Sequence, residues 1–310
     1  MYRISLILMT IALALGFGAI TVVAAEFSDW STPVNLGPVV NSPYVDSCVA
    51  ISKNGLSLFF SSTRQSPSNT MNRDLYVSQR DSIDAPWGQP TALMMLNSPA
   101  WESCPALNLD EHLLYFTSTA PGGYGQQDLW VSHRHDRRDD FGWEPPVNLG
   151  SQINTAEAEL TPSFFEDESG KVWMYFVRGG LVGGSTHIYQ SEVGDDGTFG
   201  PATPVTELNS FGFSEQGATV RRDGLEVIFL SNRRIGSGPY DFYRATREST
   251  ADPWSEPQLV PSLGVPALAQ GRIALSFDGC ELYFTSLRPG GVGSADLYIA
   301  TREKLRGNKK

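Results

Sequence analysis

The clearest pattern in this chain is a short apolar run that recurs five times, each directly after a turn signal. The turns are Asn54-Gly55, Asp110-Glu111, Asp223-Gly224 and Asp278-Gly279, with a longer version at residues 167–170 in the third repeat. The runs that follow are SLFFSS, LLYFTS, VWMYFV, EVIFLS and ELYFTS. Because they are apolar on both alternating faces, each predicts a β-strand that is covered on both sides.

Three further segments repeat in step with these runs. A Gly-rich loop comes next, as in PGGYGQQ and PGGVGSA, and a third strand follows it, such as DLYVSQR or DLYIATR. A fourth strand carries the pattern W-x-x-P at Trp30, Trp87, Trp143 and Trp254, with Phe199 in the remaining slot, at gaps of 57, 56, 56 and 55 residues. Its proline cannot donate to a ladder, so this strand is predicted at an edge.

Four short antiparallel strands repeated five times, without helical periodicity, predict an all-β, five-bladed β-propeller. The last repeat ends after its third strand, whereas residues 28–37 supply a lone strand of the fourth type. We therefore expect the N-terminal strand to complete blade five and close the ring, which protects the sheet edges. The predicted single propeller spans residues 26–303, with blade boundaries near 38, 94, 151, 206 and 264, and a basic tail follows at 304–310.

Residues 1–25 have the pattern of a secretory signal peptide, with Arg3, an apolar stretch and small residues before Glu26. We expect export to the periplasm or the extracellular space, with no stable membrane anchor after cleavage. The formal net charge of -11 makes nucleic acid a poor partner, because such binding depends on Lys and Arg that neutralise phosphates. A monomer is expected, whose partner is a protein, a peptide or a glycan.

The repeat resembles the WD40-like repeat of the TolB type, often called PD40. The shared motif stands here as NGLSLFFSSTR…DLYVSQR and again as DGCELYFTSLRPGGVGSADLY. The resemblance covers essentially the whole chain after the signal and implies a propeller, but it implies little about function, because propellers host binding proteins and enzymes alike. TolB itself has six blades and an additional N-terminal domain, so its role is not carried over. Blade three diverges most, with His187 where the other repeats have Asp.

A polar position recurs at the start of every predicted inner strand. Counting eight residues back from each turn gives Asp46, Glu102, Glu159, Glu215 and Gln270. By symmetry these side chains are expected to ring the mouth of the central channel on the top face, defined as the face that carries the Gly-rich loops. The residues that follow on the same alternating face are mostly small, and the exception, Arg272, lies in the blade that lacks the acid.

Three interpretations of this ring stay open. Each carboxylate can turn into its own blade, since buried charges are usually hydrogen-bonded or paired. The four acids can instead bind a polyhydroxyl ligand or a cation such as Ca²⁺, which prefers oxygen ligands, although no cofactor is required. Two of them can also act as general acid and base in glycan hydrolysis, which needs carboxyl groups about 6.5–9.5 Å apart in inverting enzymes. The first interpretation is favoured.

Four arginines follow the predicted second strands, at Arg64, Arg178, Arg233 and Arg288. They brace loops or contact a ligand through charge-assisted hydrogen bonds. A salt bridge to the Asp that begins strand three is not obligatory, because blade two has Ala120 in the arginine slot.

Cysteine and histidine give no further site. Cys48 and Cys104 hold matching places in neighbouring inner strands, but a disulfide needs Cα atoms within about 7 Å, so free buried thiols are expected. Cys280 has no obvious partner. The four histidines show no metal-ligand spacing, and the pair His133 and His135 is not favoured as a metal site.

No motif demands catalysis, since the chain lacks a G-x-S-x-G elbow and a Walker or dinucleotide fingerprint. The main prediction is an exported binding or scaffold module that presents the acidic ring to a protein, peptide or carbohydrate. The predicted ligand contacts are the four ring acids, Gln270, Arg272 and the four arginines after the second strands. The alternative is a glycan-active hydrolase that uses two of Asp46, Glu102, Glu159 and Glu215 as general acid and base.

Overall fold

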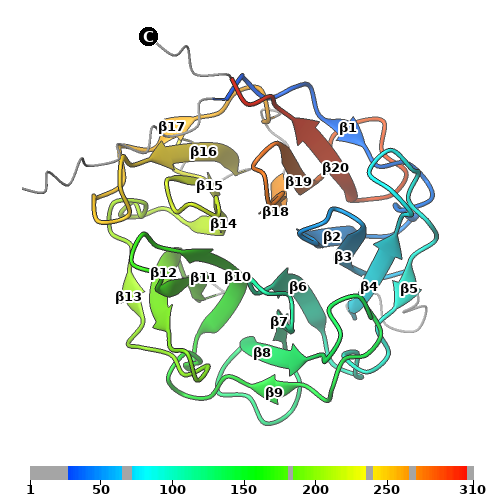
Figure 1. Cartoon of the computed structure of the whole chain (residues 1–310), viewed down its shortest axis with the longest axis horizontal. Coiled ribbons are helices and arrows are strands. Elements are labelled where there is room, and N and C mark those ends of the chain that lie inside the picture. The colour runs from blue at the N-terminus through cyan, green and yellow to red at the C-terminus, as the bar shows by residue number, and fades with distance from the viewer. Residues whose placement is uncertain (1–26, 65–71, 181–183, 235–239, 265–269, 306–310) are drawn as a thin grey trace, which may run out of the picture.

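The protein forms five antiparallel sheets of four strands, set around a central axis (Figure 1). A computed structural model describes residues 27–64, 72–180, 184–234, 240–264 and 270–305. The predicted all-β, five-bladed propeller is confirmed, and the described residues contain no α-helix. Accordingly, no helix in these ranges is long and apolar enough to cross a bilayer. The predicted signal peptide lies outside the described residues.

Each blade runs from an inner strand beside the axis to a two-residue outer strand. In blade order the strands are β2 (Asp46–Ile51), β3 (Ser57–Ser62), β4 (Asp74–Gln79), β5 (Thr91–Ala92); β6 (Glu102–Leu107), β7 (Leu113–Ser118), β8 (Asp128–His133), β9 (Val147–Asn148); β10 (Ala158–Glu166), β11 (Val172–Gly179), β12 (Thr186–Val193), β13 (Thr203–Pro204); β14 (Glu215–Val220), β15 (Glu226–Ser231), β16 (Asp241–Thr246), β17 (Gln258–Leu259); and β18 (Gln270–Leu275), β19 (Glu281–Ser286), β20 (Asp296–Thr301), β1 (Val34–Asn35). β1 pairs with β20, so the predicted closure of the ring by the N-terminal strand is confirmed.

The hydrophobic core lies between neighbouring blades. One cluster joins Phe59 of β3 to Leu114 and Phe116 of β7, and another joins Phe60 of β3 to Tyr283 of β19 across the closure. These side chains are fully or almost fully buried. The apolar runs on both faces of the second strands are therefore explained, because each sheet is covered by the next blade on either side.

The tryptophans of the W-x-x-P pattern stack under arginines from the ends of third strands. The distances from the guanidinium carbon to the ring centroid are 4.3 Å for Arg80 on Trp87, 4.5 Å for Arg134 on Trp143, 4.2 Å for Arg247 on Trp254 and 4.3 Å for Arg302 on Trp30. The same arginines donate through Nε to a carbonyl of the turn between the first and second strands. Each cation–π stack thus fastens the outer strand to the inner hairpin on the bottom face.

A β-bulge interrupts all five inner strands near their first residues. Its central residue has positive φ at Cys48, Cys104, Thr161 and Gly217. In blades one and two the bulges bring the Cα atoms of Cys48 and Cys104 to 4.4 Å, and these residues form a disulfide. The expectation of free thiols at this pair was wrong, because it assumed the separation of regular inner strands. Cys280 is a free cysteine.

We predict that this disulfide stabilises the ring. It joins cysteines 56 residues apart, and closing a loop of that length stabilises a fold by about 4 kcal/mol in the chain-entropy model. The double substitution Cys48→Ala/Cys104→Ala should lower the midpoint of urea unfolding, whereas Cys280→Ser should leave it unchanged. Thiol titration in denaturant should find one reactive thiol without reductant and three with it. Three thiols without reductant would contradict the disulfide.

On the bottom face, Glu226 at the start of β15 joins blade four to blade five. Its fully buried carboxylate accepts hydrogen bonds from Arg221 at 2.8 Å, Arg244 at 2.5 Å and Arg302 at 2.6 and 2.8 Å. Burial opposes the charge on Glu226, but the hydrogen bonds and charge of Arg302, helped by Arg244 and Arg221, outweigh it and lower the pKa of this carboxyl.

We predict that Glu226→Gln lowers the free energy of unfolding by about 3–5 kcal/mol at pH 7, because it leaves buried arginines uncompensated. A lowered pKa in the folded state gives stability that is present above the ordinary value and is lost as the pH falls through the lowered value. The gap between wild type and variant in urea unfolding should therefore narrow below about pH 4. Glu281→Gln, at the equivalent residue of β19, is the matched control and should show a smaller loss. A gap that does not change with pH would contradict the assigned charge.

Candidate functional site

The ring acids lie at the start of the inner strands, as the repeat predicts, but their carboxyl groups are tied to the top-face loops. Glu102 accepts hydrogen bonds from the Ser98 amide at 3.1 Å, the Ser98 hydroxyl at 2.6 Å and the Ser118 hydroxyl at 3.1 Å. Its side chain is about 1% exposed. Glu102 therefore fastens the loop that enters blade two to the first residue of β6.

The same arrangement recurs in blades one and three. Asp46 accepts from the Ser42 amide and hydroxyl at 2.5 and 2.8 Å, and Glu159 accepts from the Thr155 amide and hydroxyl at 3.0 and 2.6 Å. Each of these partners is a Ser or Thr that follows an Asn and stands four residues before the acid. That N-[ST]-x-x-x-[DE] spacing was a sequence signal of loop capping that the repeat comparison missed.

The four arginines brace the same loops. Arg64 contacts Asp46 at 2.7 Å, Arg178 contacts Glu159 at 2.9 Å and Arg233 contacts Glu215 at 3.2 Å. Each of the four also donates to a carbonyl of the connecting loop, at Val40, Ile153, Leu208 and, for Arg288, Leu263. Arg64, Arg178 and Arg233 thus contact the ring acids of their own blades, whereas Arg288 belongs to blade five, which has Gln270 instead of an acid.

Blade four is held differently. Besides Arg233, Glu215 accepts from the Ser231 hydroxyl at 3.0 Å and lies 3.1 Å from Nδ1 of His187, which comes from blade three. Burial raises the pKa of Glu215, and the contacts with His187 and Arg233 act against that rise. In blade five, Gln270 starts β18, but the side chains of Gln270 and Arg272 lie outside the described residues.

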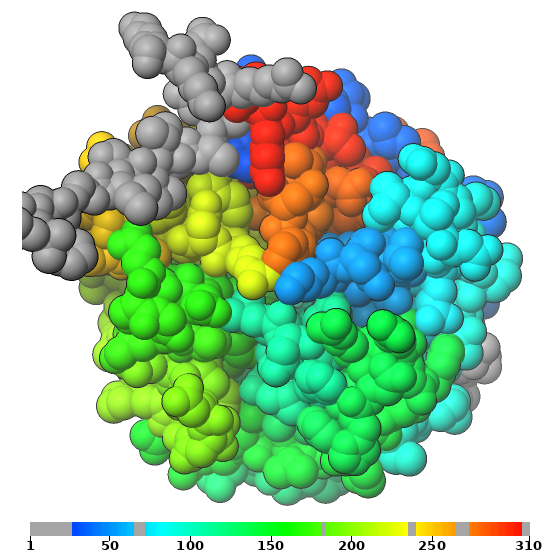
Figure 2. All heavy atoms as spheres, in the orientation of Figure 1, coloured from blue at the N-terminus to red at the C-terminus, as the bar shows by residue number. Residues whose placement is uncertain are grey.

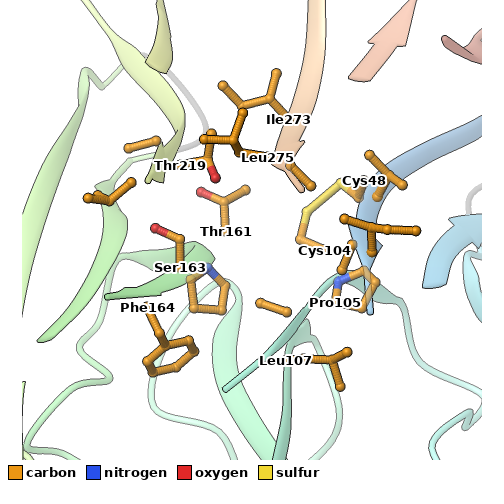
Figure 3. A pocket seen from close by; sticks show the side chains of 18 residues that line it. Cys48, Cys104, Pro105, Leu107, Thr161, Ser163, Phe164, Thr219, Ile273 and Leu275 are labelled. Atoms are coloured by element: carbon orange, nitrogen blue, oxygen red, sulfur yellow. A yellow bond between two sulfur atoms is a disulfide. The ribbon is translucent and has the colours of Figure 1, made fainter. Parts of the chain in front are cut away.

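The small residues that follow the ring acids line the axial cavity, as expected, but the acids themselves are not part of its lining. The cavity has a volume of about 130 Å³, and its walls are the inner-strand residues after the ring acids, with no carboxylate among them. The space-filling view shows the inner strands converging on the axis (Figure 2). Figure 3 shows the Cys48–Cys104 disulfide on one wall and the hydroxyls of Thr161, Ser163 and Thr219 on the other. A lining of hydroxyl and apolar side chains does not fit Ca²⁺, which takes six to eight oxygen ligands and favours carboxylates.

Asp74 and Glu102 lie at the boundary between blades one and two, where the Glu102 amide donates to the Arg73 carbonyl at 2.8 Å. Glu102 is the one ring acid without an ion pair among the described residues, since Ala120 replaces the arginine. Burial raises the pKa of Glu102, the hydrogen bonds from Ser98 and Ser118 oppose the rise, and the charge of Asp74 adds to it. Burial also raises the pKa of Asp74, which begins β4 and is partly exposed. Sequence reasoning considered the Asp that begins strand three as a salt-bridge partner of the arginine and did not include Asp74 among the site residues.

Aromatic side chains lie on the top-face loops of blades one and two. Tyr44 and Tyr124 are about half exposed, and Trp101 directly precedes Glu102. The guanidinium of Arg73 lies 5.1 Å from the ring centroid of Trp101, and burial lowers the pKa of Arg73. The indole Nε1 of Trp101 is buried without a hydrogen-bond partner among the described residues. The half-exposed rings of Tyr44 and Tyr124, each with a hydroxyl at its edge, are suited to a ligand that is apolar on one face and polar at its rim.

Comparison with known proteins gives structural neighbours but no family. No family model matches the chain, and no curated protein matches it. Among solved structures, the chain is similar to an α-L-arabinofuranosidase from Lactobacillus brevis, with a TM-score of 0.59, 14% identity and coverage of 89% of this chain and 96% of that one. It is similar to the catalytic domain of a family 62 α-L-arabinofuranosidase from Coprinopsis cinerea, with a TM-score of 0.58, 15% identity and coverage of 90% of this chain and 97% of that one. It is also similar to an endo-arabinase from Bacteroides thetaiotaomicron, with a TM-score of 0.56, 17% identity and coverage of 91% of this chain and 100% of that one.

These neighbours correct two predictions. The assignment to the TolB-type repeat family was wrong, because the similar structures are glycoside hydrolases and no family model supports that repeat. In blade one, the F-S-S and D-L-Y motifs supply buried side chains, including Phe60, Leu75 and Tyr76. The main prediction of a binding or scaffold module is also replaced, since the neighbours favour the alternative, a glycan-active hydrolase. Because the identities are only 14–17%, the structural similarity establishes the fold of this chain and nothing further.

We predict that Glu102→Gln raises the melting temperature at neutral pH. A carboxyl whose pKa is raised by folding contributes stability that is present below its ordinary value of 4.5 and is lost as the pH rises through the raised value. The variant should therefore melt above wild type at pH 7–8, and the difference should vanish near pH 4.5. Gln270 shows that an amide occupies this position in blade five. Asp46→Asn, which breaks the ion pair with Arg64, is the control and should lower the melting temperature at pH 7. An equal loss for Glu102→Gln at both pH values would contradict the prediction.

Proposed function

We propose that this protein is a glycan-active hydrolase whose site lies on the top face between blades one and two. The observation that carries the proposal is that the Glu102 amide, at the start of β6, donates to the carbonyl of Arg73 beside Asp74, and that burial raises the pKa of both carboxyl groups. The structural similarity to arabinofuranosidases and an arabinase supports the same class of substrate.

A pair of this kind supplies the two protonation states that glycoside hydrolysis needs. Burial raises the pKa of both groups, and the charge of Asp74 adds to the rise at Glu102, so protonation of Asp74 favours the charged form of Glu102. Asp74 is the more exposed group, so in its protonated form it donates a proton to the glycosidic oxygen, and charged Glu102 accepts a proton from the attacking water. Since Glu102 is about 1% exposed, the proposal requires substrate binding to open residues 98–101 above it.

The surroundings of the pair suit a sugar. Trp101 directly precedes Glu102, and the half-exposed rings of Tyr44 and Tyr124 lie on neighbouring top-face loops. Such rings can stack on the apolar face of a pyranose or furanose, while Arg73 can meet hydroxyl groups. We also propose that the protein is exported, as its N-terminal sequence predicts. The Cys48–Cys104 disulfide supports this, since such bonds persist in oxidising compartments.

The test is turnover of aryl α-L-arabinofuranoside, aryl β-D-xyloside, arabinan and xylan by the purified protein. We expect hydrolysis of at least one of these, with kcat reduced about 10²–10⁴-fold in Asp74→Asn and Glu102→Gln, the contribution typical of general acid–base groups. Glu159→Gln is the matched control, because Glu159 occupies the equivalent ring position but is paired with Arg178, and it should keep wild-type kcat.

The pH dependence gives an independent check. The acidic limb of kcat/KM should report an apparent pKa of the pair above the ordinary values for carboxyl groups, and it should move in Asp74→Asn. Absence of turnover on the whole panel, or full activity in both variants with native melting curves, would overturn the proposal. Binding of these glycans without hydrolysis would also overturn it.

A further inference from the structure

Two histidines and a glutamate of blade two converge beyond the end of β8, and none of them belongs to the proposed hydrolase site. His133 ends β8, His135 lies two residues later, and Glu144 lies on the segment that pairs with them. Their ligand atoms all lie within 4.8 Å of one another. We propose that His133, His135 and Glu144 bind a Zn²⁺ ion. The sequence did not favour the histidine pair as a metal site, because Glu144 is brought in only by the pairing of strands.

The backbone fixes the direction of the two imidazoles. Arg134, between the histidines, is about 1% exposed and reaches inward to Asp140 at 2.6 Å and to the Glu111 carbonyl at 2.8 Å. Its ring contact with Trp143 adds to this anchor. Because side chains alternate along an extended strand, burial of Arg134 directs His133 and His135 to the same outer side.

Glu144 is held opposite the histidines by antiparallel pairing. Arg134 pairs with Trp143, the Glu144 amide donates to the His133 carbonyl at 2.8 Å, and the Ser132 hydroxyl donates to the Glu144 carbonyl at 2.5 Å. Directly opposite residues in such a pair have Cβ atoms about 4.5–5.5 Å apart. The three side chains therefore project from a rigid two-stranded ribbon.

The distances suit tetrahedral zinc. Oε1 of Glu144 lies 3.2 Å from Nδ1 of His133 and 3.2 Å from Nε2 of His135. With metal–ligand bonds of about 2.1 Å, the edge of a tetrahedron is about 3.4 Å. An ion can thus enter with small side-chain adjustments. Two imidazole nitrogens and one carboxylate oxygen favour Zn²⁺ over Ca²⁺ or Mg²⁺, which take oxygen ligands.

The site is open and has an outer support. The side chains of His133, Glu144 and His135 are 40%, 47% and 88% exposed, so solvent water can complete the coordination. The ring of His112 stacks on His133 with centroids 6.2 Å apart, and Nδ1 of His112 lies 2.9 Å from the Arg134 carbonyl. The stacked ring of His112 limits rotation of the His133 ring. Residues that contact metal ligands from behind commonly orient them in this way.

The test is calorimetric titration of ZnCl₂ into the tag-free, metal-free protein at about pH 7.5. We expect saturable binding of one ion per chain, weakened at least tenfold in His135→Ala and in Glu144→Gln, since even outer-shell changes cost 10–100-fold. His187→Asn and Cys280→Ser are the controls and should keep wild-type affinity, because neither residue lies in the cluster. Neutral imidazole is the ligand, so affinity should fall on lowering the pH to about 5.5.

A second measurement separates zinc binding from effects of the substitutions on folding. Zn²⁺ in excess should raise the melting temperature of wild type and His187→Asn, and should leave His135→Ala unchanged, since a ligand stabilises only the state that binds it. No saturable binding to wild type, or equal binding by wild type and both cluster variants, would overturn the proposal. Neither result depends on glycan turnover.

Discussion

A buried carboxylate at the start of the inner strands fixes the top face of this propeller. An unpartnered charge in that position would cost several kcal/mol, so Asp46, Glu102 and Glu159 each draw the amide and hydroxyl of a loop residue onto the strand. The Asn just before that residue binds the third strand of the preceding blade, as Asn97 does with Leu75 and Asn154 with Leu129. One two-residue motif thereby couples each loop to two blades.

The blades differ in how they neutralise this charge, and the difference places the proposed site. Arginines pair with the acid in blades one, three and four, and His187 of blade three adds a second partner to Glu215. In blade two, Ala120 stands at the position of the arginine. The preceding blade contributes the acid Asp74, whose charge adds to the rise in the pKa of Glu102. The ring acid of blade four, Glu215, is therefore paired with cationic groups. The ring acid of blade two, Glu102, is instead influenced by a second carboxylate.

The regular repeat was sufficient to predict the strands and the ring closure, because turn chemistry and apolar runs are local properties. It favoured ring acids that are hydrogen-bonded within the blades, in agreement with the bonds of Asp46, Glu102 and Glu159, but it did not specify their partners or the local backbone. Two-residue alternation placed Asp46 and Cys48 on one channel-facing side, but the bulge between Ser47 and Ala50 breaks that alternation. For the same reason the distance between Cys48 and Cys104 could not be taken from regular strands. The partnership of Glu144 with His133 and His135 depends on the register of two strands separated by a loop, which no local pattern specifies.

The Cys48–Cys104 disulfide lies at the same boundary between blades as Asp74 and Glu102, and it restrains the strands there. Cys48 and Cys104 link β2 to β6, the strands that begin with Asp46 and Glu102. Two like-charged groups in a flexible boundary would lower their repulsion by moving apart, because Coulomb energy falls with distance. A covalent bond between the inner strands opposes that separation. Burial is the main cause that raises the pKa of Asp74 and Glu102, and the disulfide holds the strands that bury Glu102 together. Blades one and two, unlike the other neighbouring pairs among the described residues, combine a covalent link with a ring acid that has no ion pair.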